Sequence, residues 1–230
     1  MLRKLLILPV IVIALSAAVS GIGAQESPPG TSLVIDNFAG YQAGKFPSKW
    51  RTWPFQRGKA TEVYQVAQEN GQKILRARDS NGLSPEIMRY FNWDIQKYPY
   101  LSWRWKAKTL PTGAQENDDN KNDSACGIYV IVGGYTGNAV KYVWSSQLPA
   151  GQIVTRREGK LKIKITDSGA AKLNTWRKNS VNVPADYKEL FGSELKKNPS
   201  GIGVLTDSNA TGTDAACDYA DFIISKEPLK

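Results

Sequence analysis

The chain has 230 residues, of which 41% are hydrophobic and 22% charged, a composition typical of globular proteins and not of disordered or collagen-like ones. Its 30 lysines and arginines outnumber 21 acidic residues, so the formal net charge is +9. Histidine is absent, which excludes a Ser-His-Asp triad, a Cys-His pair, histidine-ligated zinc and an imidazole base. Any catalysis therefore has to use carboxylates, Tyr, Lys, Arg or a metal held by oxygen ligands.

The N-terminal segment, residues 1–24, has the features of a secretory signal peptide. Arg3 and Lys4 precede an apolar run over residues 5–19, and small residues follow it. This run is shorter than the roughly 20 residues of a membrane-spanning helix. We therefore predict cleavage and a periplasmic or secreted protein without stable membrane insertion. An uncleaved N-terminal anchor is the alternative.

The remaining residues, 25–230, are enough for one large core, and we predict one domain. Removal of Arg3 and Lys4 with the signal peptide leaves a net charge of +7. This charge favours anionic neighbours such as an acidic glycan, and plain solubility is the alternative. Nucleic acid is not an expected partner of an exported protein. In such a protein Cys126 and Cys217 most simply form a disulfide, the alternative being two free buried cysteines.

Strand patterns dominate the chain. In order, the predicted strands are 31–38, 61–67, 73–78, 86–91, 100–108, 126–132, 139–144, 160–165, 176–183, 201–206 and 218–225. The clearest is 100–108, where apolar and polar residues alternate, so one face packs on a core. Residues 184–191 are predicted as one short helix, because Pro184 begins it and Gly192 follows it. This pattern indicates an all-β protein, an antiparallel β-sandwich.

Three groups of motifs carry a resemblance to a known family. They are YPYLSWRW at 98–105 with LP at 110–111 and GA at 113–114; residues 139–149 around YVWS at 142–145; and LTDSNATG at 205–212 with YADF at 219–222. These stretches resemble domain of unknown function (DUF) family 3047 of exported bacterial proteins. The resemblance implies a β-rich exported domain without an established activity. More loosely, the IDNF motif at 35–38 and the closing acidic strand are similar to the galactose-binding-like jelly rolls of carbohydrate-binding modules.

Seven tryptophans suggest contact with carbohydrate, because a flat indole face stacks on the apolar face of a sugar ring. Trp103 and Trp105 share the apolar face of their strand and are predicted to lie in the core. The other aromatic candidates lie in a proline-broken basic loop or on one face of a strand. The predicted ligand-binding aromatics are Trp50, Trp53, Tyr142 and Trp144. Burial of these rings, as a lid or in the core, is the alternative.

Arg104 lies on the polar face of strand 100–108. There it could hold a carboxylate or sulfate of a glycan, the alternative being a cross-strand salt bridge. Residues 207–212 carry oxygen side chains at alternate positions before a glycine, as in a calcium loop. The predicted ligand-binding residues here are Asp207 and Asn209, and the candidate Ca²⁺ ligands are Asp207, Asn209, Thr211 and Asp218. A polar turn is the alternative, because Asp218 replaces the usual Glu.

Other acidic residues are weaker candidates for a metal site or a catalytic pair. Asp36 and Asp221 lie on the first and last predicted strands and could hold a structural Ca²⁺ if those strands pair. The acidic stretch 116–123 is predicted as a solvated loop. No pair of carboxylates stands out as the catalytic pair of a glycosidase, and no phosphate-binding loop is present.

The sequence therefore leaves three functions open. The first is an exported, non-catalytic sandwich that binds carbohydrate, with an acidic glycan of the cell envelope or surroundings as a candidate ligand. The second is a polysaccharide hydrolase or lyase that works without histidine. The third is a structural or interaction protein of the periplasm, which requires the four candidate aromatic side chains to be buried.

Overall fold

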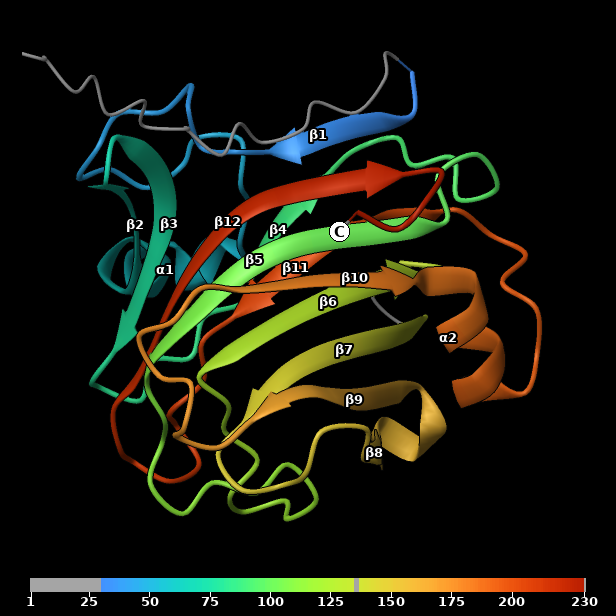
Figure 1. The fold of residues 1–230 in the computed structure, drawn as a ribbon. Coiled ribbons are helices and arrows are strands. Elements are labelled where there is room, and N and C mark those ends of the chain that lie inside the picture. Colours follow the sequence, from blue (N-terminus) through green and yellow to red (C-terminus); the bar gives the residue numbers. More distant parts are fainter. Residues whose placement is uncertain (1–29, 135–136, 230) are drawn as a thin grey trace, which may run out of the picture.

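Two six-stranded β-sheets pack face to face (Figure 1). The computed structural model describes residues 30–134 and 137–229, so the predicted signal peptide lies outside the described residues. No helix in these two ranges is long and apolar enough to cross a membrane. The all-β sandwich predicted from the sequence is confirmed.

The first sheet, called sheet A, has the strand order β10-β5-β12-β3-β2, and β1 also pairs with β12. Its strands are β1 (Ser32–Asp36), β2 (Tyr64–Glu69), β3 (Gln72–Asp79), β5 (Tyr100–Thr109), β10 (Arg177–Asn182) and β12 (Ala215–Ser225). Sheet B has the order β4-β11-β6-β7-β9-β8. Its strands are β4 (Ile87–Tyr90), β6 (Cys126–Val132), β7 (Asn138–Ser145), β8 (Ile153–Arg156), β9 (Leu161–Ser168) and β11 (Pro199–Leu205).

One strand pairing departs from the predicted antiparallel arrangement. β7 and β9 run parallel, whereas the other pairings among the described strands are antiparallel. The chain leaves β7, forms the short edge strand β8, and returns as β9 between the two. β8 was not predicted, because four residues at a sheet edge give too short a pattern to recognise.

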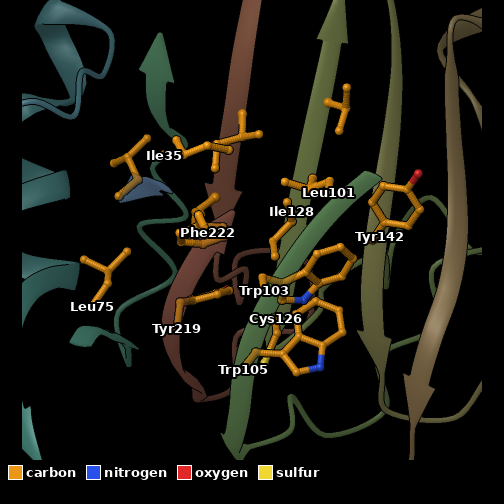
Figure 2. Packing of buried hydrophobic residues seen from close by; sticks show 14 of the residues in the cluster. Ile35, Leu75, Leu101, Trp103, Trp105, Cys126, Ile128, Tyr142, Tyr219 and Phe222 are labelled. Atoms are coloured by element: carbon orange, nitrogen blue, oxygen red, sulfur yellow. The ribbon is translucent and has the colours of Figure 1, made fainter. Parts of the chain in front are cut away.

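The core between the sheets is rich in aromatic side chains (Figure 2). Trp103 and Trp105 project from β5 toward sheet B, which confirms their predicted burial. Their ring centroids lie 5.4 Å from Tyr142 and 6.3 Å from Trp144 of β7, respectively. Tyr142 and Trp144 are thus the sheet B half of the same aromatic layer.

A disulfide joins the two layers. Cys126 on β6 of sheet B is bonded to Cys217 on β12 of sheet A, as the sequence predicted. The bond closes a loop with a sequence separation of 91 residues. Disulfides typically contribute roughly 2–4 kcal/mol of stability, because they restrict the unfolded chain.

The predicted helix is confirmed as α2 (Val183–Phe191). The Asn182 side chain accepts a hydrogen bond from the Ala185 amide at its start, and Gly192 ends it in the left-handed conformation. A second helix corrects the prediction of a strand at 61–67. Pro54 opens a short 3-10 turn, η1 (Pro54–Gln56), which continues as α1 (Arg57–Val63), so the strand β2 begins only at Tyr64. Proline suits the first turn of a helix.

Candidate functional site

The loop before η1 is attached to the edge of sheet B. Arg51 exchanges two backbone hydrogen bonds with Met88 of β4, at 2.8 and 2.7 Å. The Thr52 hydroxyl then donates to the carbonyl of Glu86 at 2.8 Å. These contacts extend the sheet by one short segment and fix the loop against the end of β4.

Trp50 anchors this loop on its inner side. Its indole is fully buried against Phe38 and Phe222, and its Nε1 donates to Asp36 at 2.9 Å. Because Trp50 and Arg51 are both fixed, the next indole, Trp53, is held on the outer side of sheet B. Trp53 keeps 41% of its surface exposed and stacks on Phe55, which is more exposed still.

A pocket of about 290 Å³ opens beside Trp53 on the outer face of sheet B. Its volume is near the lower end of the range for small-molecule sites. The loop contributes Arg51, Thr52, Trp53 and Pro54; β4 and the residue before it contribute Glu86, Met88 and Tyr90; Ile131, Gly134 and Ser200 complete the wall. Tyr90 is 54% exposed, so two aromatic rings of this wall reach solvent. The pocket therefore combines aromatic surface with one carboxyl and one guanidinium group.

Glu86 gives the pocket its acidic group. A Cβ atom at position 203 would lie 2.9 Å from Glu86 Oε1 and 2.8 Å from Met88 Sδ, so a larger residue there would displace the ends of these two side chains. Burial raises the pKa of Glu86, while the charges of Arg157 and Lys141 oppose the rise. A carboxyl group with a raised pKa keeps its proton to higher pH, where it can donate a hydrogen bond.

Buried polar groups continue from Glu86 across the same face of sheet B. Lys141 of β7 is 3% exposed, and its Nζ donates to Ser124 Oγ at 3.2 Å. Burial opposes its charge, but Tyr129, Asp207 and Glu116 outweigh that effect and raise the pKa of Lys141. Burial also raises the pKa of Asp207, to about 6, despite the neighbouring Lys141. Lys141 is thus the buried cation whose positive charge interacts favourably with the side chains of Asp207 and Glu116.

Three of the four predicted ligand-binding aromatics are buried. Trp50, Tyr142 and Trp144 have no exposed surface, so they do not present a ring to a ligand. Tyr142 donates to Asp186 of α2 at 2.8 Å, and Trp144 donates to the Gly169 carbonyl at 3.1 Å. These polar contacts let both rings face the core. Among the four, Trp53 is the one whose ring reaches solvent.

Arg104 adopts the cross-strand arrangement that was the alternative to glycan binding. Its Nε donates to Asp221 at 2.6 Å and its Nη2 donates to Gln72 at 2.6 Å. The guanidinium also lies 5.0 Å from the ring centroid of Trp176. Arg104 belongs to the outer face of sheet A, on the opposite side of the sandwich from the pocket.

The predicted calcium loop is not assembled. Asp218 forms ion pairs with Arg76, Arg78 and Lys106. The Thr211 hydroxyl donates to Asp123 at 2.6 Å instead of facing Asp207. No group of three or more acidic or cysteine side chains in the described ranges has the geometry of a metal site. Asn209 is exposed at the tip of the turn, which matches the polar-turn alternative.

Two further acidic predictions are also corrected. β1 and β12 do pair, but Asp36 accepts from Tyr41 and Trp50 whereas Asp221 binds Arg104 on the other face of the sheet. They therefore do not share a cation. The stretch 116–123 is not fully solvated, because Glu116 and Asp123 at its ends are buried. Asp123 accepts the amides of Ala210 and Thr211 and so fixes the turn after β11.

Sequence reasoning identified Trp53 but missed Arg51, Glu86 and Tyr90. Glu86 and Tyr90 alternate within the predicted strand 86–91, which places them on one face. The sequence pattern alone therefore indicates that Glu86 and Tyr90 lie on the same face of this strand. The pairing of Arg51 with Met88, which brings the loop beside this face, has no signature in the sequence.

Residues 48–223 match the family described as "Protein of unknown function (DUF3047)". The chain belongs to the DUF3047 family. The matched span contains Trp53, Glu86 and both cysteines of the disulfide. No curated protein matches the sequence of this DUF3047 chain.

Solved structures similar to this DUF3047 chain include carbohydrate-binding modules. The family 11 module of the cellulosomal cellulase Lic26A-Cel5E of Clostridium thermocellum is 10% identical, with a TM-score of 0.41 over 84% of this chain and 94% of that one. TmCBM61 in complex with β-1,4-galactotriose is 13% identical, with a TM-score of 0.37 over 80% and 92%. The xyloglucanase domain of the effector NopAA from Sinorhizobium fredii, in complex with cellobiose, is 8% identical, with a TM-score of 0.43 over 85% and 98%. At these TM-scores, no residue role follows from the likeness.

Proposed function

We propose that this chain is an exported, non-catalytic protein that binds carbohydrate in the pocket beside Trp53. One observation carries the proposal: the exposed rings of Trp53 and Tyr90 both line this pocket, together with Arg51 and Glu86. Other large aromatic side chains of the sandwich, such as Trp50, Trp103 and Trp144, are buried. The two exposed pocket rings are therefore available to a ligand.

The pocket has the chemistry that a sugar requires. An indole or phenol face covers the C–H face of a pyranose ring, which removes apolar surface from water. The hydroxyl groups at the edge of the ring need polar partners, and the pocket offers Arg51 as a donor and Glu86 as a donor or acceptor. Tethering by Thr52 and by the Arg51–Met88 bridge keeps this arrangement in place before a ligand arrives.

A hydrolase is the alternative that the pocket partly supports. A carboxyl group with a raised pKa, such as Glu86, is what a general acid needs. Glycoside hydrolysis also needs a second carboxylate across the scissile bond. Among the described residues that line the pocket, Glu86 is the one acidic side chain. Binding without catalysis is therefore the function we propose.

The interaction-protein alternative required all four candidate aromatics to be buried. The exposure of Trp53 and its place in the pocket wall speak against it. The exported location is part of the proposal and is supported by the signal-peptide pattern at residues 1–24. Fractionation of bacteria that express the chain with and without these residues tests it; cytoplasmic retention of the full chain would contradict export.

Affinity electrophoresis in gels that contain neutral polysaccharides, such as xyloglucan, β-glucan and galactan, tests the binding. We expect retardation in at least one gel, its loss in Trp53→Ala, and no change in Ile153→Ala. Ile153 is a matched control because it is also a large exposed hydrophobic residue but does not line the pocket. Equal mobility of folded wild-type protein in every gel would overturn the proposal.

A further inference from the structure

The outer face of sheet A carries an excess of positive charge. Along β3, β5 and β10, six cationic side chains point to this face: Arg76, Arg78, Arg104, Lys106, Lys108 and Lys178. Three carboxylates share the face, from Glu69, Asp218 and Asp221. These strands belong to one layer, in which β12 lies between β5 and β3 (Figure 1). Among the described strand residues, this face therefore has a net charge of about +3.

One buried carboxylate organises the centre of this face. Asp218 lies directly opposite Arg76 of β3 on one side and Lys106 of β5 on the other. Its Oδ1 contacts Arg76 Nε and Arg78 Nη1, both at 3.3 Å, and its Oδ2 lies 3.5 Å from Lys106 Nζ. Asp218 is fully buried, so a single negative charge is shared by three cations.

This sharing leaves the two arginines able to take a second anion. Arg76 and Arg78 each contact Asp218 through one nitrogen, and their side chains remain 32% and 37% exposed. A guanidinium has five N–H donors, so each keeps donors that point away from Asp218. Two residues apart on a strand, the arginines share one face about 7 Å from each other. Lys108 lies at a bulge of β5, and Lys106 and Lys108 together lower the pKa of Glu69 on this face.

We propose that this basic face of sheet A, centred on Arg76, Arg78 and Lys108, binds the carboxylate groups of an acidic polysaccharide. The site is separate from the pocket on sheet B and adds an anionic ligand class to the proposed function, on which the choice of a polysaccharide rests. A linear polymer suits the face because its cations are spread over β10, β5 and, across β12, β3, and do not converge on one point. The large exposed hydrophobic residues of sheet A, Leu33 and Val34, lie on β1 and not on β3, β5, β10 or β12, whereas a membrane-binding surface would insert such side chains beside its cations.

Two double variants with the same loss of charge test the proposal. Arg78→Gln with Lys108→Gln changes the basic face, and Arg76 and Lys106 keep their ion pairs with Asp218, so we expect the variant to fold, which circular dichroism checks. Lys196→Gln with Lys197→Gln is the control, because both lysines are exposed in the segment after α2. The probe is polygalacturonate, with affinity measured by gel retardation and calorimetry at low salt. We expect about tenfold weaker binding in the first variant and less than a twofold change in the control.

Several results would overturn the proposal. They are the absence of binding to polygalacturonate, an equal loss in both double variants, and binding that persists undiminished at high salt, where screening should remove it. Anionic phospholipid vesicles or DNA bound as tightly as polygalacturonate, with the same sensitivity to Arg78→Gln, would overturn the choice of partner. Neutral polysaccharides serve as an independent readout: they should bind both double variants normally, whereas Trp53→Ala should affect them and leave polygalacturonate binding intact.

Discussion

Trp50 and Trp53 lie three residues apart in one loop and have opposite environments. Trp50 is fully buried and donates its indole proton to Asp36, whereas Trp53 is 41% exposed at the edge of the pocket. The bridge between Arg51 and Met88 separates them, because it fixes the backbone on the sheet edge between the two rings. The first tryptophan holds the loop and the second is available for binding.

This relationship predicts different costs for the two alanine variants. Trp50→Ala should lower the free energy of unfolding by about 3–5 kcal/mol, because it opens a cavity and removes one of the hydrogen-bond donors to Asp36. Trp53→Ala should cost less than about 1 kcal/mol, since much of its surface is already in water. Urea unfolding followed by circular dichroism measures both values. Similar costs for the two variants would contradict the assigned roles.

The two acidic residues on the paired terminal strands give a second matched comparison. Asp36 accepts hydrogen bonds from the Phe38 amide, the Tyr41 hydroxyl and the Trp50 indole, and it is buried. Asp221 is partly exposed and binds Arg104. Asp36→Ala should therefore destabilise the fold by roughly 2–4 kcal/mol and Asp221→Ala by about 1 kcal/mol or less. Thermal unfolding of both variants is the measurement, and a larger loss for Asp221→Ala would refute the comparison.

The bond between Cys126 and Cys217 should stabilise the sandwich by joining its layers. Replacing both cysteines by alanine is expected to lower the free energy of unfolding by roughly 2–4 kcal/mol. Reducing agent should have a similar effect on the wild-type protein and none on the variant. Urea titrations with and without reductant test this, and an unchanged midpoint after complete reduction would show that the cross-link contributes nothing.

Asp207 should make stability depend on pH. Burial raises its pKa from 3.8 to about 6, so between these values the folded state keeps a proton that the unfolded state has released. Stability from this group is therefore greatest at low pH and falls as pH rises through the window, by roughly 3 kcal/mol for a shift of about two units. Comparing wild type with Asp207→Asn at pH 4 and pH 6.5 isolates the effect. The wild type should lose more stability over this interval than the variant; parallel losses would contradict the assignment.

Much of the fold was predictable because alternation directly reports a half-buried strand. Strand 100–108 is the example: Trp103 and Trp105 fall on its apolar face and are buried. The same rule failed at 61–67, where a short helix started by Pro54 runs into a strand. There, the local pattern fits both structures, and tertiary packing decides between them.

The candidate site was less predictable than the fold. On β7, residues of both faces are mostly apolar, so the sequence does not tell which side receives Tyr142 and Trp144. Packing against Trp103 and Trp105 turns them inward. The pocket combines residues whose proximity depends on strand register, such as Ser200 and Tyr90, and register is set by the whole sheet.

The position of β12 has a consequence for the order of folding. It is the last strand of the described chain, yet it pairs with β1, β3 and β5, so sheet A is complete only when residues 215–225 are available for pairing. Before that, β3 and β5 lack the strand that lies between them, and Cys217 on β12 is not in place to form its disulfide with Cys126. We therefore expect sheet A to be completed in a late, cooperative step of folding.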